Sequence, residues 1–132
     1  MEIQTKVLPL GGIGDLYSIV AKEINDDGGV FHLYLNPECI IYKAHFPEQP
    51  ITPGVCITQI AVELAENVVG HGLQMIGIKN VKFLSIMTPD SQPEVIYNIT
   101  IKSSDDKETR IQAVAQSDDV VYAKMSLICK RK

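Results

Sequence analysis

The sequence predicts an α+β domain in which an antiparallel sheet wraps around one long helix. The first observation is the run at 54–69, which has helical i, i+3, i+4, i+7 spacing and apolar residues on nearly every side. A helix of that kind is buried on most of its faces. The second observation is that extended segments separated by short turns flank this run, and strands joined in this way pair antiparallel. One helix this apolar is buried only if such a sheet curls around it.

Two strands are expected ahead of the helix, at 16–25 and 30–35. Between them, Asp26 to Gly29 supplies Asp-Gly and Gly-Gly steps, which permit positive φ in a tight hairpin. The segment from Pro37 to Pro53 is rich in proline, which fixes φ and pushes the preceding residue toward extended geometry. That segment is therefore expected to be irregular but stiff.

Four extended segments are expected after the helix, which the glycines at Gly70 and Gly72 should end. Their side chains alternate between apolar and polar, which is the period of a strand with one buried face. They lie at 75–87, 94–102, 109–117 and 120–130.

Length and composition favour one globular domain spanning 1–132. The net charge of −4 argues against nucleic acid as the main partner, because phosphate binding needs a basic surface. No apolar run is long enough for a membrane span, and the N-terminus lacks the pattern of an export signal. The cysteines are few and far apart, as is typical of reduced thiols in a cytoplasmic protein. No histidine has the spacing with cysteines or acids that suggests a metal site, and no cofactor is expected.

The segment around the start of the helix has the residues for acid–base chemistry. His45 precedes the proline-rich loop, and Gly54 begins the apolar helix. The first N–H groups of a helix have no partner within it and carry the positive end of its dipole. A glycine there lets a ligand approach the backbone closely. A histidine base facing such a donor suits removal of a proton α to a carbonyl, because negative charge then builds on the carbonyl oxygen.

The stretch HFPEQPITPGV (45–55) resembles the H-F-P-x-x-P-x-x-P-G-V signature of the hot-dog-fold 3-hydroxyacyl-(acyl-carrier-protein) dehydratases, a FabZ/FabA-like family of fatty-acid synthesis. The resemblance covers about residues 16 to 129 and includes GIKNVKFLSIMTPDSQPEV after the helix. It implies a hot-dog fold and a lyase that converts 3-hydroxyacyl thioesters to trans-2-enoyl thioesters in fatty-acid or polyene synthesis.

Carried over to this sequence, the resemblance implies that His45 is the catalytic base. The N–H of Gly54 would bind the thioester carbonyl, and the carbonyl of Ile51 would orient the His45 ring. The acyl chain would lie in a tunnel beside the central helix, carried by an acyl-carrier protein or coenzyme A. The substrate-binding positions of the motif are Phe46, Ile51, Pro53, Gly54 and Val55.

The sequence departs from the family at the acid. The family has Glu or Asp at the position of Gln59 and commonly Gln at the position of Glu63, so the two residue types are exchanged here. In one interpretation Glu63 replaces the acid from one turn deeper, since residues i and i+4 share a helix face; otherwise Glu63 is a structural carboxylate. In a second, His45 performs both proton transfers while Gln59 only orients the hydroxyl. In a third, a heterodimer with an acid-bearing paralogue completes one site, because the family's sites form at a two-fold interface.

Two other functions also stay open. The same fold hosts acyl-thioester hydrolases, and fold alone does not decide function. Gln59 is equally compatible with a non-catalytic partner subunit. A homodimer is the assembly that the resemblance implies, and Lys79 and Lys82 are candidates for docking an acidic carrier protein.

Overall fold

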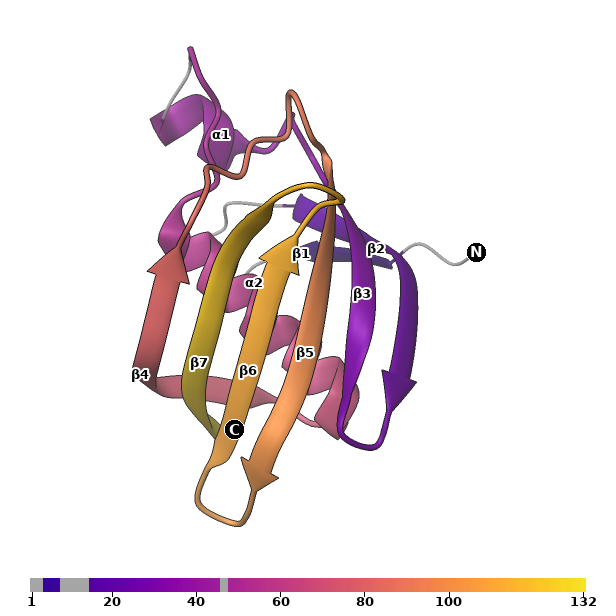
Figure 1. The fold of residues 1–132 in the computed structure, drawn as a ribbon, viewed down its shortest axis with the longest axis vertical. Helices are drawn as coiled ribbons and strands as arrows, with labels where there is room; N and C mark the ends of the chain where they lie inside the picture. The colour runs from indigo at the N-terminus through magenta and orange to yellow at the C-terminus, as the bar shows by residue number, and fades with distance from the viewer. Residues whose placement is uncertain (1–3, 8–14, 46–47) are drawn as a thin grey trace.

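The computed structural model describes residues 4–7, 15–45 and 48–132 (Figure 1). Its helices are α1 (Ile40–His45) and α2 (Gly54–Val69). Its strands are β1 (Gln4–Val7), β2 (Asp15–Asn25), β3 (Gly28–Leu35), β4 (Leu73–Phe83), β5 (Glu94–Ser104), β6 (Thr109–Gln116) and β7 (Val121–Arg131).

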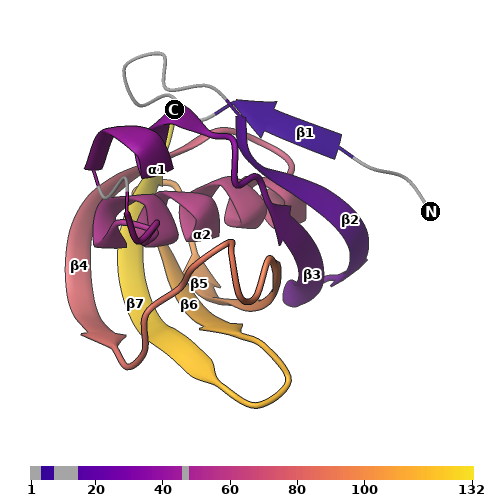
Figure 2. The same cartoon turned by 90° about the horizontal axis from the view of Figure 1, so that it is seen from above.

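The strands form one sheet in the order β1-β2-β3-β5-β6-β7-β4, and every neighbouring pair is antiparallel. The sheet curves around α2, which lies in its concave face, while α1 sits at one end of the helix (Figures 1 and 2). The predicted α+β arrangement, with a sheet wrapped around one helix, is therefore confirmed. β4, the strand that follows the helix, lies at one edge of the sheet.

Helix α2 is held in the sheet by apolar packing and by one buried hydrogen bond. Cys56, Ile60 and Leu64 have no exposed surface. The hydroxyl of Tyr97 on β5 donates to the carbonyl oxygen of Ile57 at 3.0 Å. The helix ends as predicted at Gly70, whose φ of 82° is left-handed and whose N–H donates to the helix.

The β2–β3 hairpin differs from the prediction in how it uses its glycines. The turn consists of Asp26 and Asp27, with Asn25 opposite Gly28, and the N–H of Asp27 donates to the Asn25 side chain at 2.9 Å. Gly28 and its neighbour lie in β3, and neither has a positive φ. Gly28 is needed for space instead, because a Cβ there would lie 2.1 Å from the carbonyl oxygen of Ile99 on β5.

Gly28→Ala should therefore destabilise the fold strongly. The added methyl group meets backbone, which cannot move aside as a side chain can, so we expect a loss of about 2–3 kcal/mol in the free energy of unfolding. Gly77→Ala on β4 is the matched control, because its Cβ would find Ile128 atoms at 3.9 Å, an ordinary contact. Chemical denaturation of both variants measures the difference. Equal stability of the two would contradict the close approach at Gly28.

Three further boundaries differ from the sequence-based expectation. The segment from Pro37 to Pro53 is not wholly irregular, since it contains the six-residue helix α1. The strand expected at 75–87 begins at Leu73 and ends at Phe83, four residues early. Strand β1 was not anticipated at all, because four residues show too little alternation to predict a strand.

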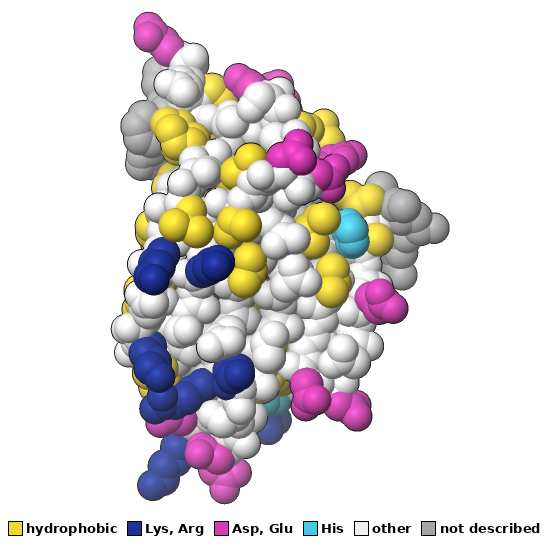
Figure 3. All heavy atoms as spheres, viewed as in Figure 1, with side chains coloured by type: hydrophobic (Ala, Val, Ile, Leu, Met, Phe, Trp, Pro, Cys, Tyr) yellow, Lys and Arg dark blue, Asp and Glu magenta, His cyan; other side chains and the backbone are white. Residues whose placement is uncertain are grey.

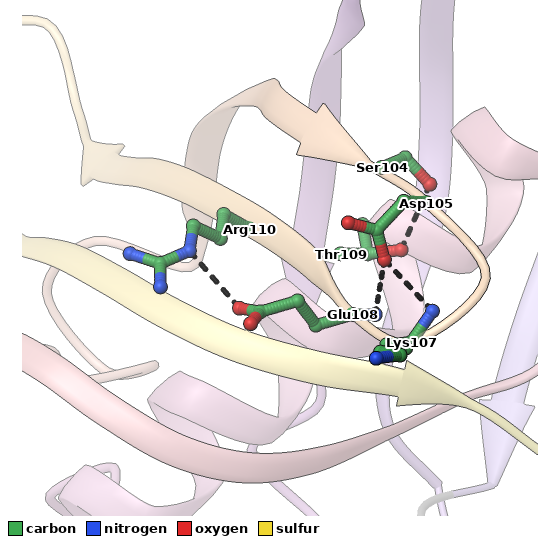
Figure 4. Close-up of polar contacts among 6 residues, drawn as sticks. All are labelled: Ser104, Asp105, Lys107, Glu108, Thr109 and Arg110. Atoms are coloured by element: carbon green, nitrogen blue, oxygen red, sulfur yellow. Dashed lines mark hydrogen bonds and ion pairs between the residues drawn. The ribbon is translucent and has the colours of Figure 1, made fainter.

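The β5–β6 hairpin is closed by the side chain of Asp105 (Figure 4). Its Oδ1 accepts the N–H groups of Lys107 at 2.7 Å and Glu108 at 2.9 Å. These bonds, that of Glu108 first, lower the pKa of the Asp105 carboxyl. The stabilisation is thus present above the carboxyl's ordinary pKa and is lost as pH falls through the lowered value.

The cysteines are free and buried, in agreement with their expected state as unpaired thiols: Cys39, Cys56 and Cys129. Burial raises the pKa of the Cys56 and Cys129 thiols to about 11, so both are protonated at neutral pH. Within the described ranges, no helix has the length and apolar character that crossing a membrane requires.

Candidate functional site

The loop ahead of α2 is anchored on both sides by hydrogen bonds to Thr52. The hydroxyls of Tyr42 on α1 and Thr52 lie 2.9 Å apart, and both residues are buried. The N–H of Thr52 donates to the carbonyl of Met87 at 2.8 Å. Burial raises the pKa of the Tyr42 phenol well above its usual value, so the hydroxyl keeps its proton. α1, which ends at His45, is thereby tied to the residues immediately before Gly54.

Tyr42→Phe should weaken this anchor and lower both stability and turnover. The change leaves the Thr52 hydroxyl buried without its partner, which costs about 1–2 kcal/mol. Because the loop between α1 and α2 then moves more freely, the rate of any reaction that needs His45 falls as well. Tyr34→Phe is the control, since Tyr34 lies 44% exposed on β3. Thermal unfolding and steady-state kinetics of both variants test this, and identical behaviour of the two would contradict it.

Helix α2 begins at Gly54 with an open N-terminal end. Pro53 is the N-cap residue, and its carbonyl accepts the N–H groups of Cys56 at 3.0 Å and Ile57 at 3.1 Å. Proline provides no capping side chain, and the first turn contains no acidic residue. In the part of the chain that the structure describes, the positive end of the helix dipole is therefore left for a ligand oxygen.

Gly54 also makes room for an aromatic ring. A Cβ at this position would lie 2.8 Å from Cζ of Phe83, the last residue of β4. The Phe83 side chain is nevertheless 53% exposed, so one side of the ring faces outward. Gly54 is the position where a ligand is expected to come close to the backbone. The Phe83 ring of β4 comes close to the same residue.

Gln59 and Glu63 meet on one face of α2. The Gln59 Nε2 group donates to Glu63 Oε2 at 3.3 Å, and the Tyr17 hydroxyl on β2 donates to Glu63 Oε1 at 2.9 Å. Glu63 is only 8% exposed, whereas Gln59 is half-buried. Burial, with the Glu63 carboxylate beside it, raises the pKa of the Tyr17 phenol well above its usual range, so Tyr17 remains a donor. Both carboxylate oxygens of Glu63 are therefore engaged inside the protein.

The same face carries a polar stripe along a largely apolar helix. Asn67 lies one turn beyond Glu63, and its Nδ2 donates to the Glu63 carbonyl at 3.2 Å. Lys22 on β2 donates to Asn67 Oδ1 at 3.3 Å. Gln59, Glu63 and Asn67 thus follow i, i+4, i+8 spacing and are tied to β2.

The other predicted site residues that the structure describes lie at the end of α1, in the loop ahead of α2 and in the first turn of α2. His45 is the last residue of α1, but its side chain and the whole of Phe46 lie outside the described residues. Ile51 is half-buried in the loop, and Val55 is 61% exposed in the first turn of α2. The roles predicted for these residues, and for Gln59, stay predictions. Among the described residues, no group of three or more potential metal ligands comes together.

A hollow lies on the convex face of the sheet, opposite to the face that packs on α2. It encloses about 420 Å³ and is lined by strand residues that include His32, Glu94 and Ile96. His32 alternates with the inward-facing Phe31 and Leu33 on β3, so it points away from α2. This hollow is therefore separate from the start of the helix.

A match to a known protein family accompanies these structural features, which are the wrapped helix, its open glycine start and the loop before it. Residues 21–126 match the family model described as ApeI-like, ApeI dehydratase. The chain belongs to the ApeI-like dehydratase family. The resemblance inferred from HFPEQPITPGV is confirmed at this level.

Curated relatives of this ApeI-like chain are named as dehydratases. It is 28% identical over 100 residues to the 3-hydroxyacyl-[acyl-carrier-protein] dehydratase FabZ of Cupriavidus taiwanensis, covering 69% of this chain and 66% of the relative. It is 28% identical over 104 residues to FabZ of Burkholderia mallei, covering 69% and 64%. The chain thus spans slightly less than two thirds of the length of these relatives.

Solved structures share the fold of the ApeI-like chain. The dehydratase heterocomplex ApeI:P from Xenorhabdus doucetiae superposes with a TM-score of 0.72 at 20% identity, over 86% of this chain and 96% of the other. A hypothetical thioesterase with coenzyme A from Streptococcus pneumoniae gives 0.65 at 8% identity, over 88% and 85%. Both are similar in fold, which confirms the hot-dog expectation.

Three residues of the site region were not found from the sequence of this ApeI-like chain. Tyr17 lies 46 residues from Glu63, so no local pattern connects them. Tyr42 and Thr52 are ten residues apart on either side of the proline-rich loop, where the sequence indicated no regular contact. The one available signal was the presence of a tyrosine and a threonine among apolar residues, since buried hydroxyls need a partner.

Proposed function

We propose that this chain provides the histidine and the thioester-binding half of a 3-hydroxyacyl-thioester dehydratase. His45 removes a proton from C2, negative charge builds on the thioester oxygen, and the N–H of Gly54 stabilises it. The C3–O bond then breaks, and the departing hydroxide takes up a proton to leave as water. The observation that supports this most directly is the uncapped glycine start of α2, directly after a loop tied to α1.

The proton that the departing hydroxide takes up has to come from a suitable acid. Glu63 is an unsuitable acid because Tyr17 and Gln59 already donate to its two oxygens and little of it is exposed. Gln59 is an amide, which can hold a hydroxyl by hydrogen bonds but does not supply a proton. The chain by itself therefore works with His45 alone or takes its acid from elsewhere.

A second candidate function is that of one subunit in a heterodimer whose partner carries the acid. The exchange of Gln59 and Glu63 favours it, and the fold neighbour named ApeI:P is a dehydratase heterocomplex. In such a pair, His45 of this chain and a carboxylate of the related subunit would complete one site.

The direct test is conversion of a short 3-hydroxyacyl thioester to its enoyl product by the purified chain, with and without an acid-bearing paralogue. Slow turnover alone and a clear gain on mixing support the proposal. Free thiol is measured in the same samples, because its release without enoyl product would indicate a thioesterase instead. Absence of both products in every mixture would refute dehydration by this chain.

The charge distribution favours a negatively charged carrier, such as an acidic carrier protein. Lys and Arg side chains gather on the side of the molecule where β4 and β7 lie (Figure 3). Lys82 and Lys124 face each other directly across these strands, a like-charge pair that an acidic partner would relieve. Lys79 on β4 and Arg110 on β6 line a small cavity that β7 residues also line.

Reversing the charge of Lys82 and Lys124 to Glu should raise KM for a carrier-protein-bound substrate by about five- to tenfold, because rim charges steer association. The KM for the same acyl group on a short thiol should stay unchanged. Lys107→Glu in the distant β5–β6 turn is the control. An equal rise for both substrates would speak for damage to the site rather than for docking.

A further inference from the structure

The hydrogen bond between Gln59 and Glu63 determines which end of the Gln59 amide is free. An ionised carboxylate only accepts hydrogen bonds, whereas an amide has one end that donates and one that accepts. Since Glu63 Oε2 lies 3.3 Å away, the amide must present its NH₂ group to it, because the reverse orientation would bring two acceptors together. The Gln59 oxygen then points away from Glu63.

Glu63 itself has little freedom to adjust. It is buried, and the Tyr17 hydroxyl donates to its other oxygen at 2.9 Å. Tyr17 is fully buried on β2 and keeps its proton, so this donor is constant across the neutral pH range. The carboxylate is thus fixed to the sheet, and through it so is the orientation of the half-buried amide one turn earlier.

A group that presents only an acceptor discriminates between two closely related ligands. A 3-hydroxyacyl thioester has an O–H that donates to the Gln59 oxygen. A 3-oxoacyl thioester differs by two hydrogens and has only acceptors at C3, so it would face the amide oxygen with no hydrogen bond. Leaving a polar group unpaired in this way is more costly than a lost contact.

We infer that Glu63 is a positioning residue that makes this site select 3-hydroxyacyl over 3-oxoacyl thioesters, by holding the Gln59 amide with its oxygen toward the substrate. The inference rests on the proposed function, since it places the substrate's C3 oxygen at Gln59. Glu63 acts through Gln59 and does not touch the substrate.

The test is direct binding of the two thioesters, with equal chain length, to variants made in a His45→Ala background so that neither ligand is consumed. The parent should bind the 3-hydroxyacyl thioester about three- to tenfold more tightly than the 3-oxoacyl thioester, the order that one hydrogen bond contributes. Glu63→Gln should reduce this ratio to near one by a gain in 3-oxoacyl affinity. Because the Tyr17 hydroxyl holds the oxygen of the new amide, the new NH₂ group faces Gln59 and turns its amide round. The Gln59 NH₂ group then faces the substrate, and the C3 oxygen of either thioester can accept from it. A gain of affinity is not produced by simple loss of structure.

Two further variants complete the test. Glu66→Gln is the matched control on the same helix, because Glu66 accepts the N–H of Leu73 and has no bond to Gln59 among those described; its ratio should equal that of the parent. Gln59→Leu removes the amide and should also lower the ratio, in this case by a loss of 3-hydroxyacyl affinity. It also serves if Glu63→Gln does not fold.

The outcomes separate the two proposals. Binding of both thioesters with a ratio that neither Glu63→Gln nor Gln59→Leu changes would overturn the inference and leave the proposed function standing. Failure of the parent to bind either thioester would overturn the proposed function and the inference with it. A lower ratio in Gln59→Leu, with an unchanged ratio in folded Glu63→Gln, would place the substrate hydroxyl at Gln59. It would also show that Glu63 does not orient the Gln59 amide.

Discussion

The double exchange Gln59→Glu with Glu63→Gln should raise dehydration by the chain on its own by about a hundredfold or more, since a placed general acid contributes roughly 10² to 10⁴ in rate. It puts a carboxylic acid at the position where the dehydratase family has one, next to an amide that still pairs with it across one helical turn. The Tyr17 hydroxyl still finds an acceptor in the new amide oxygen. The enoyl product is measured with a short 3-hydroxyacyl thioester.

The single exchange Gln59→Glu is the informative control for this variant. It puts two carboxylates where the structure has one hydrogen bond of 3.3 Å, and like charges at i, i+4 destabilise a helix. We expect a lower melting temperature than that of the double variant. If the double variant is folded and shows no gain in rate, a missing acid is not what limits this chain.

His45→Ala should abolish that gain and lower turnover by about 10² to 10⁴, the contribution of a positioned base. The experiment is best made in the background of the double exchange, where the rate to be lost is highest. His32→Ala is the matched control, since His32 is exposed on the convex face of the sheet and should leave the rate unchanged.

Equal rates in the two histidine variants would remove His45 from the mechanism. A loss of rate with an unchanged melting temperature would assign the effect to chemistry rather than folding. The same pair of variants, tested in a mixture with an acid-bearing paralogue, would show whether His45 works in that assembly as well.

The long, regular elements of the fold could be predicted because their signals are local. Helix α2 and the four strands after it have clear periodicity, and the turns between β5, β6 and β7 are short. The pairings of β3 with β5 and of β7 with β4 join strands that are not consecutive, so no hairpin turn in the sequence indicates them. The short helix α1 could not be predicted because six residues between prolines are too few to show a helical period.

The site could be predicted in its residue types but not in its connections. The spacing of His45 and Gly54 indicated a base and a helix start, and the family resemblance pointed to Gln59 as the anomaly. What Glu63 does depends on Tyr17, which reaches it only because β2 folds against α2. A carboxylate that points to solvent and one that is fixed inside the protein have the same sequence signature.

The pairing of Gln59 with Glu63 also bears on how such proteins diverge. Glutamine and glutamate have nearly the same shape, so exchanging them within the pair alters neither the side-chain volume nor the net charge, and keeps one donor facing one acceptor. Selection for stability alone therefore hardly distinguishes which of the two positions carries the amide and which carries the carboxylate. Two substitutions separate a chain with an acid at position 59 from one without, and a duplicated gene can drift from one role to the other while its product remains folded.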